Sequence, residues 1–179
     1  MISDLTPAMS RLISTIDESI AGRAASTDGA AADVANVLGS FLPHGGLLTA
    51  AQSAPDPQRY RQHLIYGDPG GAFSIASLVW LPGQSTPIHD HVCWCVVGVL
   101  KGWEHETRFI TDANGANPVP VSNSINTEGS TSVASPPVDV HQVANRSGDT
   151  AISLHIYGCD LQALKTSIRR VYDPPRGHA

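Results

Sequence analysis

Residues 83–102 read GQSTPIHDHVCWCVVGVLKG, and this stretch decides how the rest of the chain is interpreted. The apolar residues on either side of the two histidines predict strands. Because side chains two positions apart on a strand point to the same side, His89 and His91 can aim both rings at one point. Imidazole is a common metal ligand in proteins. The pair therefore indicates a metal site, and two histidines that hydrogen-bond to each other without a metal are the alternative.

The apolar runs beyond this stretch are short and are separated by turn-forming residues. From about Tyr60 onward they read HLIY, FSIASLVW, CVVGVL, HETRFI, TSVA, HQVAN and AISLHIYG. Many short strands at this spacing predict an all-β sandwich or barrel. Residues 112–130 are polar and turn-rich, so we expect a loop or hairpin tip with a brief strand around Val119 and Val121. Residues 161–172 predict a short final helix or an extended arm.

The first part of the chain follows a different pattern. Met9, Leu12 and Ile16 recur at helical spacing, which predicts an amphipathic helix. We expect residues 1–55 to form a helical segment that packs on the barrel, and residues 56–179 to form the barrel with a C-terminal arm. A length of 179 residues fits a single domain overall.

Composition and charge exclude several classes of protein. Eleven Lys and Arg against sixteen Asp and Glu give a net charge of −5, which argues against nucleic-acid binding. No apolar run approaches the roughly 20 residues that cross a membrane. The N-terminal residues lack the apolar core of an export signal, so we expect a cytoplasmic protein with reduced cysteines. The sequence leaves the oligomeric state open.

Further histidines lie on two later strand-like runs. His141 would complete a three-nitrogen site, which leaves positions on the metal open for other ligands, as a catalytic metal requires. In SLHIYG, the alternating residues Ser153, His155 and Tyr157 share one face of a strand. They predict a hydrogen-bonded relay that ends at a phenol near the metal. A simple solvent-exposed face is the alternative for these three residues.

The cysteines allow more than one interpretation. In an unbroken strand, Cys93 and Cys95 would point to the same side as the two histidines of the opening stretch. They could serve as small apolar packing residues or as thiolate ligands of a zinc site with mixed His and Cys ligands. We expect Cys159 to be inert.

Taken together, these motifs resemble the cupin superfamily and, within it, the thiol dioxygenases of the cysteine dioxygenase type. Gly83, His89, His91 and Gly102 match the first cupin signature, with Cys95 at its glutamate position, and His141 with Asn145 matches the end of the second. Replacement of that glutamate and the Ser153, His155, Tyr157 triplet are further features of the dioxygenases. The resemblance implies a double-stranded β-helix, or jelly-roll, barrel.

Two positions bear on the subgroup. Gln62, two residues after Tyr60, stands where cysteine dioxygenases of the mammalian type carry arginine. A glutamine at this position resembles the bacterial 3-mercaptopropionate dioxygenases. That bacterial group usually carries glycine in place of Cys95, whereas the mammalian type carries a cysteine joined by a thioether to the tyrosine that matches Tyr157. The chain therefore mixes features of both subgroups, and the resemblance implies a possible Cys95–Tyr157 link.

The resemblance also implies an activity and a cofactor. Fe(II) on His89, His91 and His141 would support the addition of both atoms of O₂ to the sulfur of a small thiol, which gives a sulfinic acid. The favoured substrate is 3-mercaptopropionate, with cysteine and mercaptosuccinate as alternatives. Tyr157, oriented by His155 and Ser153, would donate a hydrogen bond in the site.

The carboxylate of such a substrate also needs side chains that bind it. Tyr60 and Gln62 would line it, and Arg169 or Arg170 would supply the positive charge if the C-terminal arm folds over the mouth. A non-catalytic cupin that binds a metal or a small ligand, and a zinc or manganese isomerase, are the competing functions.

Overall fold

The computed structural model describes residues 4–22, 28–112, 114–137 and 139–174. Its helices are α1 (Pro7–Ile20), α2 (Asp28–Phe41) and α3 (Leu161–Leu164), with the 3₁₀ turns η1 (Leu42–His44) and η2 (Ala51–Ser53). Its strands are β1 (Arg61–Gly67), β2 (Ser74–Trp80), β3 (Ile88–His91), β4 (Cys95–Lys101), β5 (Trp103–Ile110), β6 (Val119–Thr127), β7 (Thr131–Ala134), β8 (His141–Ala144), β9 (Ala151–Tyr157) and β10 (Ile168–Tyr172).

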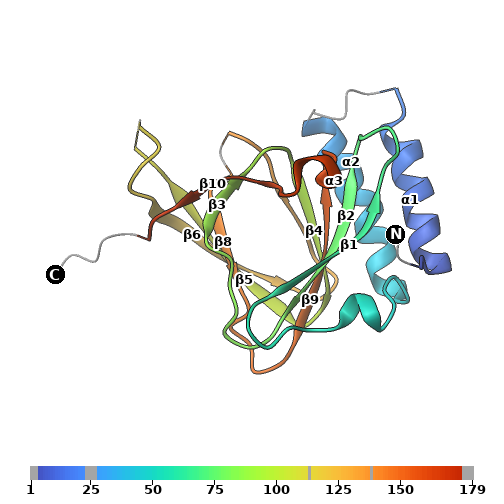
Figure 1. Cartoon of the computed structure of the whole chain (residues 1–179), viewed down its shortest axis with the longest axis horizontal. Coiled ribbons are helices and arrows are strands. Elements are labelled where there is room, and N and C mark those ends of the chain that lie inside the picture. Colours follow the sequence, from blue (N-terminus) through green and yellow to red (C-terminus); the bar gives the residue numbers. More distant parts are fainter. Residues whose placement is uncertain (1–3, 23–27, 113, 138, 175–179) are drawn as a thin grey trace.

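The strands form two five-stranded sheets that face each other (Figure 1). We call the sheet with strand order β1-β2-β9-β4-β7 the helix-covered sheet, and the sheet with order β10-β3-β8-β5-β6 the open sheet. Every strand pair within them is antiparallel. The prediction of an all-β fold preceded by N-terminal helices is confirmed.

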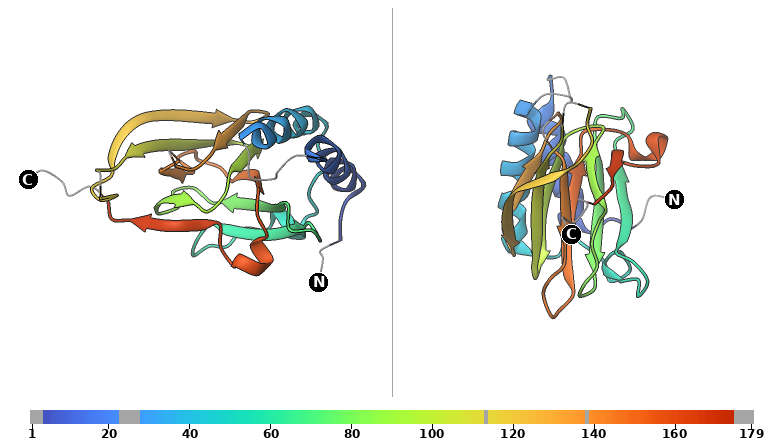
Figure 2. Two further views of the ribbon diagram at one scale, coloured as in Figure 1. Left: turned by 90° about the horizontal axis from the view of Figure 1, so that it is seen from above. Right: turned by 90° about the vertical axis from the view of Figure 1, so that its left-hand side faces the viewer.

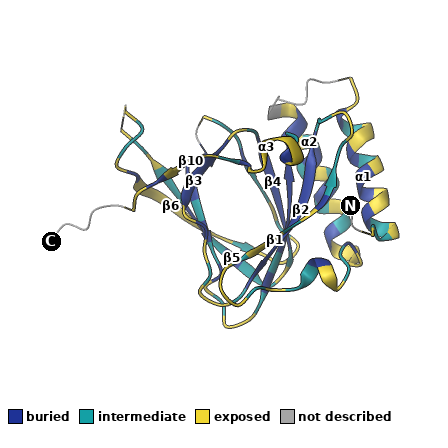
Figure 3. Cartoon of the chain, viewed as in Figure 1, coloured by how far each residue is buried: buried dark blue, intermediate teal, exposed yellow. Residues whose placement is uncertain are grey.

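Helices α1 and α2 lie against the outer face of the helix-covered sheet (Figure 2). Their apolar sides, with Met9, Leu12 and Leu38 fully buried, share one cluster with Val96 and Ile156 of the sheet. Figure 3 shows the result, with buried residues where the helices meet the strands and exposed residues on the opposite side of each helix. The sheet is therefore shielded from water on the face that does not line the barrel. The division of the chain near residue 55 stays a prediction.

The three central strands of the helix-covered sheet, β2, β9 and β4, are buried along most of their length and carry mainly apolar residues. All seven residues of β2 are buried. On β9 the two faces still differ in character. Leu154 and Ile156 join the cluster under the helices, whereas Tyr157 belongs to the cluster between the sheets. The face of Ser153, His155 and Tyr157 is thus the interior, and the solvent-exposed alternative is wrong.

Two segments are more ordered than their sequence suggested. The predicted loop or hairpin tip contains β6, a nine-residue strand that pairs with β5 along its length. The C-terminal segment combines both forms that the sequence allowed, since the one-turn helix α3 is followed by strand β10 beside β3. Strand β6 is exposed along nearly all of its length, so it lacks the buried apolar pattern by which strands are predicted.

The expectation of inert, reduced cysteines is not met by the structure, which joins Cys93 and Cys159 in a disulfide. Cys93 lies between β3 and β4, and Cys159 follows β9. The prediction that Cys93 points to the same side as the two histidines failed because the strand is interrupted after His91 and resumes only at Cys95. Cys95 is buried and carries a free thiol.

None of the helices in the described part of the chain combines the length and the apolar character needed to cross a membrane.

The close contact between α2 and β4 gives a testable prediction. A β-carbon at Gly98 would lie 2.6 Å from Leu38 Cδ2, so in Gly98→Ala the buried side chain of Leu38 must shift within the packed contact between α2 and β4. We expect a loss of about 1–3 kcal/mol in the free energy of unfolding, which urea denaturation would measure.

Gly39→Ala is the matched control on the same helix. Its β-carbon would make an ordinary contact at 3.7 Å from Thr131, and alanine favours the helix by roughly 0.5–1 kcal/mol. Equal stability of the two variants would contradict the proposed tight contact at Gly98.

Candidate functional site

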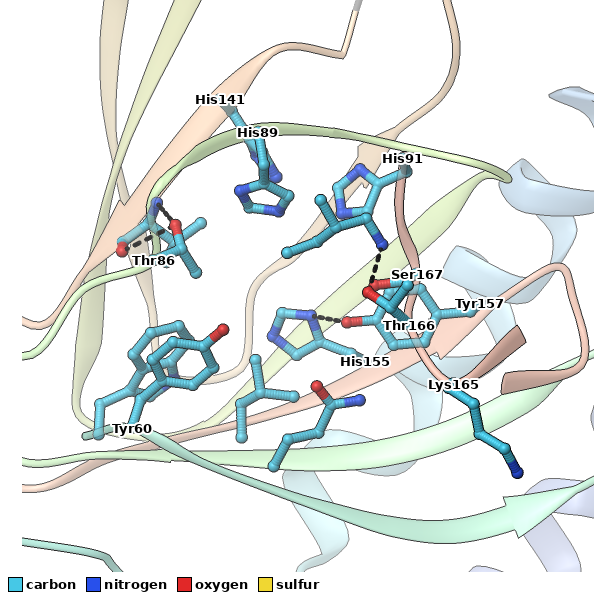
Figure 4. Close-up of a pocket in the computed structure, with 15 residues that line it drawn as sticks. Tyr60, Thr86, His89, His91, His141, His155, Tyr157, Lys165, Thr166 and Ser167 are labelled. Atoms are coloured by element: carbon cyan, nitrogen blue, oxygen red, sulfur yellow. Dashed lines mark hydrogen bonds between the residues drawn. The ribbon is translucent and has the colours of Figure 1, made fainter. Parts of the chain in front are cut away.

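Three buried histidines meet between the two sheets, on the inner face of the open sheet. Strand β3 supplies His89 and His91, and its neighbour β8 supplies His141, which lies directly opposite His89 in the pairing. The ring centroids are 4.7–5.0 Å apart, and their ligand nitrogens lie within 4.8 Å of one another. Figure 4 shows the three rings pointing into one cavity. The structure thus brings together the three imidazoles that the sequence predicted.

Each ring is oriented by an acceptor behind it. The Nδ1 atoms of His89, His91 and His141 lie 3.0, 3.0 and 2.9 Å from the Pro87 carbonyl oxygen, Asp139 Oδ2 and Glu106 Oε1. Since an acceptor at Nδ1 holds the hydrogen there, the Nε2 lone pair of each ring faces the cavity. His141 Nε2 is buried and has no hydrogen-bond partner among the described residues. Three imidazoles whose ligand nitrogens converge in this way fit a bound metal ion.

The electrostatic environment favours the neutral form of His89 and His141, as metal ligation requires. Burial, together with the nearby charges of His141 and His91, lowers the pKa of His89 to about 3. Burial also lowers the pKa of His141. Burial opposes the ionisation of Glu106, but the hydrogen bond from His141 and the guanidinium of Arg108, 3.0 Å away, hold its pKa at about 2. A buried carboxylate therefore stands behind a neutral ligand.

A second polar group lines the opposite wall, on the inner face of the helix-covered sheet. His155 Nε2 lies 2.9 Å from Ser153 Oγ, and His155 Nδ1 lies 3.3 Å from Tyr157 Oη (Figure 4). Trp80 Nε1 donates to Ser153 Oγ at 3.3 Å. Burial raises the pKa of Tyr157 well above its ordinary value, so its phenol keeps its hydrogen. The predicted relay is present as a continuous chain of hydrogen bonds.

Cys95 lies beside the end of this chain. It is the direct partner of Tyr157 in the β4–β9 pairing, and its Sγ is 3.7 Å from His155 Nδ1. Burial raises the pKa of its thiol above the ordinary value. The candidate metal-ligating group in the described part of the chain consists of the three histidines and does not include Cys95. The alternative of a zinc site with mixed His and Cys ligands is therefore not supported.

The histidines and the relay face a cavity of about 120 Å³. This is small beside the roughly 300–1,000 Å³ of sites for drug-sized ligands. Tyr60 and Gln62 line it as predicted, and the ring of Tyr60 stacks on Trp80 with the centroids 4.6 Å apart. The C-terminal arm closes over the mouth and contributes residues 165–168 to the lining.

The predicted arginines are not among the residues that line this cavity. Arg169 forms an ion pair with Asp90, whose Oδ2 also accepts a hydrogen bond of 2.7 Å from the Tyr172 hydroxyl. Arg170 lies over the ring of Tyr172, with its Cζ 4.8 Å from the centroid. Both lie on β10, where the register of pairing shifts between Ile168 and Arg170. The simple alternation of side chains along a strand therefore did not predict which way these two arginines point. This placement corrects the expectation that one of them faces the substrate.

Lysine supplies the positive charge at the mouth instead. Lys165 ends α3 with a left-handed backbone, at φ 66°, and lines the cavity. In Figure 4 its side chain extends away from the histidines. Sequence reasoning missed Lys165, and it also missed Asp139 and Glu106. Asp139 could have been found, because it lies two residues before His141, whereas nothing in the sequence links Glu106 to His141.

Solved structures support the fold. The chain is similar to an uncharacterized conserved protein with a double-stranded β-helix domain from Klebsiella pneumoniae, at 13% identity over 65% of this chain and 91% of that one, with a TM-score of 0.50. It is also similar to a cupin 2 conserved barrel domain protein from Salinispora arenicola, at 19% identity over 62% of this chain and 83% of that one, with a TM-score of 0.44. At such identities the likeness concerns the fold alone, and the Klebsiella structure supports a double-stranded β-helix.

A comparison with protein families is more specific. The model of the family described as cysteine dioxygenase type I matches residues 28–170, which include strands β1 to β9, all three histidines and the polar relay. The match extends over well more than half of the chain. The protein therefore belongs to the cysteine dioxygenase type I family.

Proposed function

We propose that the protein is a non-haem iron dioxygenase that converts a small mercaptocarboxylate and O₂ to the corresponding sulfinic acid, with 3-mercaptopropionate as the favoured substrate. The observation that carries the proposal is the group of three buried imidazoles in a small cavity, each oriented by an acceptor at Nδ1. Membership of the cysteine dioxygenase type I family supports thiol oxidation as the reaction.

Fe(II) held by His89, His91 and His141 would supply the redox chemistry that adds both atoms of O₂ to sulfur. The chain itself contributes three neutral ligands, so the metal keeps its full charge toward an incoming thiol. Tyr157 lies at the far end of the polar chain and keeps its hydrogen. We assign it the role of donating a hydrogen bond to the ligands in the cavity, with His155 and Ser153 orienting its hydroxyl.

The charge of the lining favours a thiol with one carboxylate and no amine. Among the described residues that line the cavity there is no acidic side chain to pair with the ammonium group of cysteine. The nearest carboxylates, Asp139 and Glu106, face the backs of the histidines. Lys165 at the mouth has a long flexible side chain that can turn toward a carboxylate, while Gln62 can donate a neutral hydrogen bond.

The position of Cys95 beside Tyr157 supports a thioether between them. The new bond would join Sγ to the phenol ring, and the thiol hydrogen and one ring hydrogen would leave with two electrons, O₂ being the oxidant. Such a link would fix the ring of Tyr157 at the edge of the cavity.

The first test measures thiol-dependent oxygen uptake by the iron-loaded protein, with sulfinic acid identified by mass spectrometry. We expect turnover of 3-mercaptopropionate with a higher kcat/KM than of cysteine or mercaptosuccinate. Cysteine lacks a partner for its ammonium group, and mercaptosuccinate carries a second carboxylate. Iron binding without turnover of any of these thiols would favour a non-catalytic metal-binding cupin instead.

The second test concerns Lys165. We expect Lys165→Met to raise the KM for 3-mercaptopropionate about tenfold or more with a smaller change in kcat, because a charge-assisted hydrogen bond is lost. Arg170→Met, which removes a charge outside the cavity, is the matched control and should leave KM unchanged. The reverse pattern would restore the role predicted for the arginines.

The third test concerns the thioether. The intact mass of protein that has turned over, denatured and fully reduced, should include a species lighter by two hydrogens. Reduction opens the Cys93–Cys159 disulfide but not a thioether, so Cys93→Ala should retain the lighter species and Cys95→Ala should lose it. A full set of reduced cysteines in the wild-type protein after turnover would exclude the link.

A further inference from the structure

Glu104 is a buried carboxyl group that the proposed mechanism does not use. It lies on β5 with no exposed surface, two residues before Glu106 and therefore on the same face of the strand. Glu106 orients His141, but neither carboxylate oxygen of Glu104 has a hydrogen-bond partner among the described residues. A carboxylate without partners is costly to bury, so this position needs an explanation.

The polar groups that act on Glu104 from the opposite sheet are those of Ser153 and Trp80. Burial raises the pKa of Glu104 to about 7, although the Ser153 hydroxyl and the Trp80 indole N–H are close enough to oppose this rise. Trp80 and Ser153 are themselves hydrogen-bonded. Glu104 thus lies at the Ser153 end of the chain that leads through His155 to Tyr157.

We propose that Glu104 is a positioning residue that extends this chain and determines, through a hydrogen bond with Ser153, which nitrogen of His155 carries the hydrogen. The proposal rests on the proposed function, in which Tyr157 donates into the cavity. It concerns only residues of this chain and requires no contact between Glu104 and the metal.

The hydrogen-bonding capacity of Ser153 shows how this works. A hydroxyl donates one hydrogen bond and accepts two. When Glu104 is protonated, Ser153 accepts from Glu104 and from Trp80 and donates to His155 Nε2. His155 then carries its hydrogen on Nδ1 and donates to Tyr157 Oη. The hydrogen of Tyr157 remains available to the cavity.

When Glu104 is ionised, every hydrogen bond beyond Trp80 reverses. Ser153 donates to the carboxylate and accepts from His155 Nε2–H, so that His155 Nδ1 accepts the hydrogen of Tyr157. Ser153 is fully satisfied in both states, and only the direction of the chain differs. Protonation of one buried carboxyl is thereby transmitted to the phenol at the site.

Other titratable groups surround this chain and must be distinguished from Glu104. Glu106 faces it from the same strand, Cys95 from β4, His155 from β9 and His141 from β8. Burial lowers the pKa of His155 to about 3, and Glu106 ionises near 2. The pKa of the Cys95 thiol is raised by burial, so none of these three titrates close to neutrality.

The decisive experiment observes the His155 tautomer directly. Full-length protein is labelled with ¹⁵N-histidine and loaded with zinc, which is diamagnetic, and the two-bond ¹H–¹⁵N correlations of His155 are followed with pH. We expect the hydrogen to move from Nδ1 to Nε2 as the pH rises through about 7. The amide of Glu104→Gln does not titrate and can donate to Ser153 as protonated Glu104 does, so this variant should keep the hydrogen of His155 on Nδ1 throughout.

Glu128→Gln serves as the control, since Glu128 is an exposed carboxylate near Gly102 and should leave the transition intact. A wild-type His155 that keeps one tautomer across neutrality would overturn the proposal, and this result does not depend on the folding of any variant. Because the measurement does not involve turnover, it stands apart from the test of the dioxygenase activity.

Activity gives a second readout in the iron-loaded enzyme. The ratio of kcat/KM for 3-mercaptopropionate between Glu104→Gln and wild type should rise roughly threefold to tenfold as the pH passes through about 7, the factor that one neutral hydrogen bond supplies. In a Ser153→Ala background the pH dependence of this ratio should disappear. If the ratio is constant with pH when Ser153 is present, Glu104 has only a structural role.

Discussion

The site depends on the pairing of β3 with β8, which places His89 opposite His141 and sets their rings on the same side as His91. Pairing alone brings the rings together but does not aim them. Their direction is set by three acceptors, the Pro87 carbonyl and the carboxylates of Asp139 and Glu106. Removing either carboxylate would free a ring to rotate and leave its Nδ1–H buried without a partner.

The helices make this polar interior possible. Because α1 and α2 keep water from the outer face of the helix-covered sheet, β9 can place apolar residues outward and Ser153, His155 and Tyr157 inward without losing its packing. The close approach of α2 to Gly98 tightens this cover. The site therefore lies between an open sheet that supplies the proposed metal ligands and a helix-covered sheet that supplies the relay.

The alternation of residues along single strands was enough to predict His89 and His91, and likewise the relay on β9. Prediction failed where the strand is interrupted, as at Cys93, or where the register shifts, as at Arg169. Lys165 ends a one-turn helix, so no periodicity reveals its direction. Glu104 and Glu106 resemble ordinary polar residues of a strand, and only the tertiary structure shows that they are buried. Local patterns thus predict the ligands, whereas their partners depend on long-range pairing.

The distribution of charge across the site is the physical basis for the anionic substrate in the proposed function. Burial lowers the pKa of His89 and His141 and raises the pKa of Tyr157, so these three lining groups are uncharged at physiological pH. The carboxylates lie behind the histidines, and the positive charge of Lys165 lies at the mouth. In the proposed function, an anionic thiol that enters passes a cation first and meets no acidic side chain among the described lining residues on its way to the three histidines. A ligand with an ammonium group meets the same cation and finds no compensating partner inside.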